Sequence, residues 1–142
     1  MRSAPDDITE TLASLAIFAD LTRPELEKVA HSLEERYFAQ DEKVLREGLS
    51  GSSFYIILEG EAALVARGNA IGTLRRGDFF GEISVLLGEP PVADVIAVRP
   101  LRCVVVPGDL LREFLQTHPR VCYRLLVAEA RKLANVTRRS TA

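Results

Sequence analysis

Residues 34–107 alternate short apolar runs with turn signals, and this alternation limits the fold more than any other feature of the chain. The runs are too short for ordinary helices, and glycines or polar pairs separate them. Regularly spaced short strands with glycine-bearing turns are typical of a sandwich or a barrel. We therefore expect about eight strands, among them residues 37–38, 44–45, 54–58, 62–66, 71–74, 92–98 and 101–106.

Helical patterns flank this run of strands on both sides. Residues 6–15 carry apolar side chains at helical spacing, and Thr22, Pro24 and Glu25 form a capping box that opens a second helix. After the strands, Asp109 is a good N-cap for a helix over residues 110–116, and Pro119 begins a final helix that runs to about residue 136. A run of strands flanked by helices predicts an α+β domain.

Composition excludes several classes of protein. A length of 142 residues suits one domain, and a net charge of −2 provides no general attraction to nucleic acid or to an anionic membrane. The chain has no apolar run long enough to span a bilayer and no apolar signal segment at its N-terminus, so we expect a cytoplasmic protein. Cys103 and Cys122 lie in apolar segments and are expected to be buried free thiols.

The segment from residue 75 to residue 95 contains the residues that predict a ligand-binding site. Its apolar piece at residues 83–87 predicts a single short helix after Gly81, whose first backbone N–H groups have no partner within the helix. Such donors favour an anion, and Gly81 permits close approach of the backbone. Glu82 repels a phosphate but is well suited to accept hydrogen bonds from a sugar hydroxyl. Together these features suggest a sugar phosphate as the ligand.

This segment resembles the phosphate-binding cassette of cyclic-nucleotide-binding domains, the sensor domains of regulators such as the catabolite activator protein and the Crp-Fnr proteins. Gly48, Gly60, Gly77 and Pro119 match the family pattern as well, so the resemblance covers nearly the whole chain. It implies an eight-stranded antiparallel, jelly-roll-like β-roll in a single domain of residues 1–142. The N-terminal helices would occupy 1–33, the roll 34–107 with the cassette at 77–95, and two C-terminal helices 109–137.

The resemblance also implies a role for each cassette residue. Glu82 would accept a hydrogen bond from the ribose 2′-hydroxyl, and the backbone of Gly81, Ile83 and Ser84 would surround the ribose and the cyclic phosphate. Val92 and Ala93 would be the small residues beside the phosphate, and Asp94 occupies a position near the purine where the family often has threonine or serine. The implied ligand is cyclic AMP or cyclic GMP, with no other cofactor and no metal. The implied function is regulatory rather than enzymatic.

Pro91 departs from the family pattern, which has an arginine at this position to pair with the phosphate. Proline supplies neither the positive charge nor an N–H donor. One alternative is weak cyclic-nucleotide binding, with a cation from Arg75, Arg76 or Arg99. The other is a pocket that has lost its ligand or accepts one without the phosphate charge, which would make the domain a structural or dimerisation module of a larger protein.

The final helix has an apolar stripe and a basic end. In the family this helix covers the base, for which Tyr123, Arg124 and Leu126 are candidates, and it forms the dimer seam of bacterial regulators. A homodimer or a fused effector domain is therefore the expected partner, and the domain would be the sensor of a transcriptional regulator. No helix-turn-helix follows the helix, so we expect no direct nucleic-acid binding. The stripe is Cys122, Leu125, Leu126, Leu133 and Val136, and the basic residues are Arg120, Arg124, Arg131, Lys132, Arg138 and Arg139.

Overall fold

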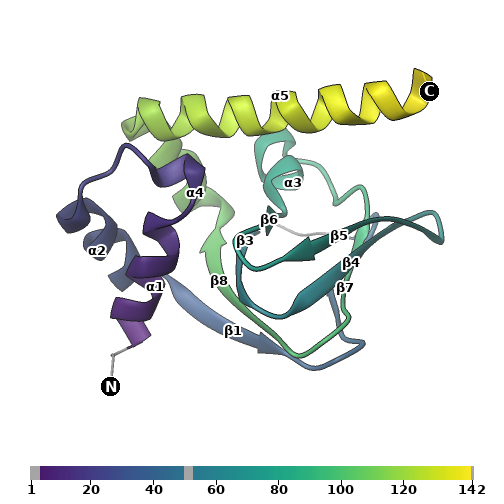
Figure 1. Ribbon diagram of the computed structural model, residues 1–142, viewed down its shortest axis with the longest axis horizontal. Helices are drawn as coiled ribbons and strands as arrows, with labels where there is room; N and C mark the ends of the chain where they lie inside the picture. Colours follow the sequence, from purple (N-terminus) through teal and green to yellow (C-terminus); the bar gives the residue numbers. More distant parts are fainter. Residues whose placement is uncertain (1–3, 50–52, 142) are drawn as a thin grey trace.

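Two four-stranded antiparallel sheets form the centre of the molecule, and helices cover one side of it (Figure 1). The structure is a computed structural model that describes residues 4–49 and 53–141. The sheet orders are β1-β8-β3-β6 and β2-β7-β4-β5, which confirms the predicted antiparallel β-roll. The strands are β1 (Glu34–Phe38), β2 (Lys43–Leu45), β3 (Ser53–Glu59), β4 (Glu61–Ala66), β5 (Asn69–Arg75), β6 (Phe79–Phe80), β7 (Asp94–Ala97) and β8 (Leu101–Pro107).

Helices stand before, within and after the run of strands, as expected. In Figure 1, α5 runs across the top of the molecule and continues past α3. No helix in the described part of the chain is both long and apolar enough to cross a membrane. The helices are α1 (Ala4–Ala13), the 3₁₀ turn η1 (Ala16–Phe18), α2 (Arg23–His31), α3 (Glu82–Leu87), α4 (Gly108–Thr117) and α5 (Pro119–Thr141).

Strand β3 divides the apolar core into two parts. Successive side chains of a strand point to opposite faces of the sheet. Phe54, Ile56 and Leu58 accordingly pack with the helices, whereas Tyr55 and Ile57 pack between the two sheets. Because both faces of β3 are buried, its sequence is a nearly continuous apolar run rather than an alternating one.

The predicted elements are present, but several of their ends are corrected. The first helix, expected over residues 6–15, spans Ala4–Ala13, and the final helix, expected to end near residue 136, continues to Thr141. The strand expected at residues 37–38 begins earlier, at Glu34. The capping box of Thr22 and Glu25 is present at the start of α2. The helix that Asp109 was expected to cap begins earlier, at Gly108, so Asp109 lies in the first turn of α4 and does not cap it. The strand expected over residues 92–98 begins only at Asp94, which lies opposite Val65. Beyond that pair β4 turns back into β5, so residues 92–93 have no partner strand there.

The two cysteines differ in their environment. Cys103 is fully buried between the sheets, and burial raises the pKa of its thiol to about 12, so the thiol is protonated at neutral pH. Cys122 is exposed, which corrects the expectation that both thiols are buried. The reason is the rotation of α5, which directs Val121 and Leu125 into the core in place of Cys122.

Candidate ligand-binding site

Helix α3 stands at the start of β3 and is held there by Gly81. This glycine has φ +88°, and a Cβ at this position would lie 2.4 Å from the carbonyl oxygen of Ser53. No L residue fits that contact without displacing backbone, so glycine lets α3 lie directly against β3. Gly88, with φ +67°, ends the helix in the same left-handed conformation. The predicted short cassette helix is therefore present, with a glycine at each end.

Glu82 is the first residue of α3 and is 3% exposed. Its Oε1 accepts a hydrogen bond from Lys132 Nζ of α5 at 3.1 Å. Its Oε2 is buried and makes no hydrogen bond to any described residue. A buried carboxylate oxygen without a donor is unfavourable, and native structures contain few of them. Glu82 can therefore accept one further hydrogen bond.

Lys132 makes three contacts at the place where α5 meets this carboxylate. Besides Glu82, its Nζ contacts Glu129 Oε1 at 3.4 Å and lies 4.2 Å from the centre of the Phe79 ring. Burial and the nearby Glu82 carboxylate raise the pKa of Glu129 to about 7, while Lys132 acts in the opposite direction. Two carboxyl groups thus share one ammonium group at the contact between α3 and α5.

The other predicted residues of α3 differ in exposure. Ser84 is buried, and its Oγ donates a hydrogen bond to the carbonyl oxygen of Glu89 at 2.5 Å. The backbone N–H groups of Gly88 and Glu89 in turn donate to the carbonyl oxygen of Ser84. Ile83 is partly exposed beside them. The hydroxyl of Ser84 therefore fixes the loop that leads from α3 to Pro91.

Pro91, Val92 and Ala93 belong to the connection between α3 and β7. Pro91 is buried, and its carbonyl oxygen accepts a hydrogen bond from the N–H of Gly48 at 2.9 Å. Ala93 is buried as well, whereas Val92 is exposed. The structure thus brings the family glycine at position 48 against the cassette. Gly81 to Ser84 lie at the start of α3, and Val92 and Ala93 follow on the loop that Ser84 holds.

The Asp94 carboxylate binds neighbouring protein groups in this structure. Its Oδ1 accepts a hydrogen bond from the N–H of Glu47 at 2.7 Å, and its Oδ2 lies 3.4 Å from Lys43 Nζ. The hydrogen bond from Glu47, followed by the influence of Lys43, lowers the pKa of Asp94. The carboxylate therefore ties β7 to β2 and to the residues that follow it.

Two of the three arginines considered as substitutes for the cassette cation, Arg75 and Arg99, are placed elsewhere, and the third, Arg76, is exposed. Arg75 and Arg99 both approach the Glu61 carboxylate, at 3.2 and 3.7 Å. Glu61 follows the end of β3, whereas Gly81 contacts Ser53 at its beginning. Seven strand residues separate the two ends by roughly 20 Å. Arg75 and Arg99 therefore cannot reach a phosphate at α3 in this arrangement.

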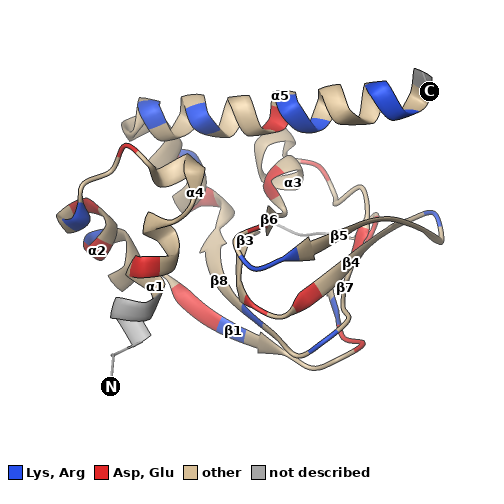
Figure 2. Ribbon diagram, viewed as in Figure 1, with Lys and Arg blue, Asp and Glu red and all other residues tan. Residues whose placement is uncertain are grey.

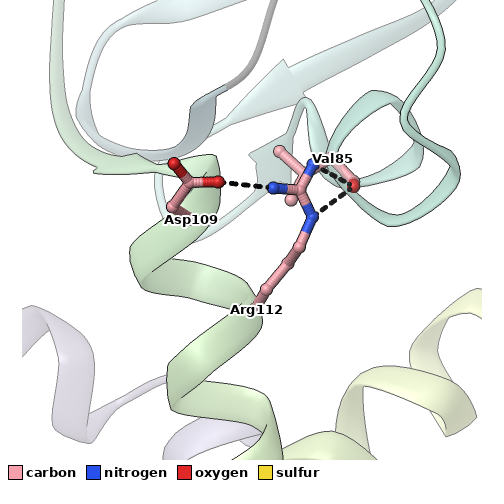
Figure 3. Close-up of polar contacts among 3 residues, drawn as sticks. All are labelled: Val85, Asp109 and Arg112. Atoms are coloured by element: carbon pink, nitrogen blue, oxygen red, sulfur yellow. Dashed lines mark hydrogen bonds and ion pairs between the residues drawn. The ribbon is translucent and has the colours of Figure 1, made fainter.

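Arg112 of α4 anchors the middle of α3 (Figure 3). Its Nε and Nη2 donate hydrogen bonds to the carbonyl oxygen of Val85 at 3.3 and 3.1 Å. Its Nη1 donates to Asp109 Oδ1 at 2.7 Å. Because α3 is short, this carbonyl is near its C-terminal end, where a cation is favourable. The Arg112 guanidinium therefore holds the cassette helix in position through these hydrogen bonds.

A cleft of about 660 Å³ lies beneath α5, but the residues Gly81 to Ser84 do not line it. Phe79 and Lys132 belong both to this cleft and to the surroundings of Glu82. Arg124, one candidate for contacting a base, instead pairs with Asp20 at 2.5 Å beside η1. The lining is Leu15, Ala16, Ile17, Gly77, Phe79, Tyr123, Arg124, Val127, Ala128, Arg131, Lys132 and Asn135.

Helix α5 meets the cassette at residues that the sequence did not single out. Its basic side chains are spread along its length, and Glu129 is the single acidic residue between Pro119 and Thr141 (Figure 2). The spacing of Glu129 and Lys132 predicts a pair on one face of a helix, but nothing in the sequence says which element that face meets. Glu129 and Arg112 are therefore functional candidates that sequence reasoning missed, and it named Lys132 only as one of the basic residues of the final helix.

Comparison with known proteins agrees with this geometry. A cGMP-dependent protein kinase of Eimeria tenella is 30% identical over 125 residues, which cover 88% of this chain but only 12% of the kinase. The chain therefore spans a small part of that relative's length.

Two solved structures share the fold. The catabolite activator protein of Thermus thermophilus has a TM-score of 0.80 at 21% identity, covering 89% of this chain and 62% of its own. The regulatory subunit of a cAMP-independent protein kinase A from Trypanosoma cruzi, bound to guanosine, has a TM-score of 0.72 at 24% identity, covering 79% of this chain and 41% of its own.

The family described as the cyclic nucleotide-binding domain matches residues 35–118. This match runs from β1 through α4 and includes the cassette and the buried Glu82. It covers more than half of the sequence, and the antiparallel roll agrees with it. The chain belongs to the cyclic nucleotide-binding domain family.

Proposed function

We propose that this chain is a cytoplasmic regulatory module, not an enzyme, that binds a ribose-containing ligand at α3 and transmits its occupancy through α5. The observation that carries the proposal is the buried carboxylate of Glu82, with one oxygen bonded to Lys132 and the other without a donor. A ribose hydroxyl would supply the missing donor. Because Lys132 belongs to α5, a ligand that changes the hydrogen bonds of Glu82 also changes the contact between Glu82 and Lys132 that links α3 to α5.

The proposed ligand contacts are those expected from the sequence. Glu82 accepts from the ribose, the backbone of Gly81, Ile83 and Ser84 surrounds the sugar, and Val92 and Ala93 lie beyond it. Cyclic AMP and cyclic GMP are the ligands that the family suggests. The position of α3, fixed by Gly81 at one end and by Arg112 near the other, supports a preformed site.

A second candidate ligand is a nucleoside without a phosphate. The charges around the cassette favour it, because three cations there are already paired: Lys132 with Glu82, Lys43 with Asp94, and Arg112 with Asp109. At position 91 itself a phosphate would meet a proline instead of a positive charge. Guanosine, which is bound in the Trypanosoma cruzi structure, is the matching probe.

Calorimetric titration of the purified chain with cyclic AMP, cyclic GMP and guanosine tests the proposal. Glu82→Gln should weaken binding of whichever probe binds by about 10- to 100-fold, because it removes a charge-assisted hydrogen bond. Glu113→Gln, an exposed glutamate of α4, is the matched control and should leave the affinity unchanged. Absence of binding by all three probes would favour the degenerate structural module instead.

The partner that responds to the position of α5 is proposed to be a second copy of the chain, or a domain linked to it. Such a domain could be a kinase or the DNA-binding part of a transcriptional regulator. Helix α5 exposes a stripe at alternating spacings of three and four residues, which is the pattern of a coiled-coil seam. The stripe is Tyr123, Leu126, Ala130, Leu133 and Thr137.

Substituting one residue of this stripe tests the dimer. Leu133 is 68% exposed, so Leu133→Asp should leave the fold intact but place a charge in the seam. We expect light scattering after gel filtration to show a dimer for the parent chain and a monomer for the variant. Ile71→Asp, on the exposed strand β5, should remain dimeric. A parent chain that is monomeric at high concentration would contradict a dimer through α5.

A further inference from the structure

Three ionisable side chains meet where α5 crosses the cassette, and two of them are acids. Glu82 of α3 is 3% exposed, and Glu129 and Lys132 both come from α5. Lys132 Nζ lies 3.1 Å from Glu82 Oε1 and 3.4 Å from Glu129 Oε1. The aromatic ring of Phe79, on β6, covers the ammonium from another side. One positive charge is therefore shared by two carboxyl groups, and the Lys132 side chain that carries it is 48% exposed.

From this arrangement we infer that Glu82, Glu129 and Lys132 form a proton-dependent latch between α3 and α5, closed when Glu129 is protonated. The inference concerns the regulation of the ligand site and rests on the proposed function for that role. With a neutral Glu129, the pair of Glu82 and Lys132 is balanced in charge, and the protonated carboxyl group can donate a hydrogen bond to Glu82. With an ionised Glu129, two anions compete for one cation and repel each other.

The proton would be exchanged near neutral pH. Burial first, and then the neighbouring Glu82 carboxylate, raise the pKa of Glu129 to about 7, against the opposing effect of Lys132. These are the charged groups that face Glu129 from α3 and α5, and Phe79 is the uncharged neighbour of Lys132. A modest change of pH around neutrality thus changes the charge of the latch.

The direction of the effect on a ligand follows from linkage. A ribose hydroxyl and the protonated Glu129 would compete as donors to Glu82 Oε2, the oxygen that has no donor, so ligand binding opens the latch and returns Glu129 to solvent. The pKa of Glu129 then falls toward its ordinary value of 4.5, and the group releases its proton. Binding that releases a proton strengthens as pH rises. From pH 6 to pH 8 the affinity should rise about tenfold, because a group of pKa about 7 passes from largely protonated to largely ionised.

The first test uses the ligand-free chain. Carboxyl-carbon NMR should show Glu129 titrating near pH 7, and the backbone amides of residues 81–85 should shift with the same midpoint. Glu129→Gln mimics the protonated form and should abolish that midpoint at residues 81–85. Lys132→Gln removes the cation that favours ionisation, so the midpoint of Glu129 should move upward. Glu129 titrating near 4.5 in the parent chain would overturn the latch.

The second test measures the affinity for cyclic AMP, cyclic GMP and guanosine at pH 6, 7 and 8. The parent chain should bind about tenfold more tightly at pH 8 than at pH 6, and Glu129→Gln should bind equally at all three. Glu113→Gln should retain the parent's pH dependence. A pH dependence that survives in Glu129→Gln would overturn the role of Glu129. If no probe binds while Glu129 titrates near pH 7 together with residues 81–85, the latch is supported and the proposed ligand site fails.

Discussion

Pro91→Arg is expected to raise the affinity for cyclic AMP and cyclic GMP by about 10- to 100-fold, because it adds one charge-assisted hydrogen bond to the phosphate. In the parent chain Lys132 is held by Glu82, and Arg75 and Arg99 lie at the far end of β3. The new side chain therefore places a positive charge at the cassette position where the family has its arginine. Isothermal calorimetry on the parent and variant chains measures the change.

The backbone at position 91 accepts this substitution. The hydrogen bond from Gly48 goes to the carbonyl oxygen of Pro91, which every residue retains. Pro91→Gln is the control, because it has a long polar side chain without the charge and should improve binding by much less. The affinity for guanosine, which has no phosphate, should stay within about twofold of the parent in both variants. Equal gains for guanosine and the cyclic nucleotides would contradict a phosphate contact.

Gly81→Ala is expected to destabilise the fold by about 2–6 kcal/mol. Two effects add: a non-glycine residue at φ +88° costs about 1–3 kcal/mol, and overpacking costs a similar amount. The added Cβ would lie 2.4 Å from the carbonyl oxygen of Ser53, which is backbone and cannot rotate away. Urea unfolding followed by circular dichroism gives the difference in the free energy of unfolding.

Gly88→Ala is the matched control at the other end of α3. It also has a left-handed backbone, with φ +67°, but a Cβ there meets no atom within 4 Å. We expect a loss of about 1–2 kcal/mol from the backbone conformation alone. If both variants lost the same free energy of unfolding, the close contact between α3 and β3 would not contribute to stability.

Much of the fold was predictable because its signals are local. The alternation of strands and turns, the flanking helices and the Thr22 capping box depend on residues close together in the chain, and the structure confirms them. Two other predictions failed where a distant partner decides the outcome. Residues 92–93 lie outside β7 because β4 has already turned toward β5. Cys122 is exposed because the rotation of α5 depends on what its other face covers.

By itself, the sequence determined the order of the elements, because strand runs, turns and helix caps depend on neighbouring residues. The cassette at residues 77–95 and the missing cation at Pro91 are what its resemblance to the family implies. Only the tertiary structure decided which side chains meet across the cassette. Lys132 is 50 positions from Glu82, and Arg112 is 27 positions from Val85. Such pairs depend on where α4 and α5 pack, and packing is set by burial over the whole core rather than by any local pattern.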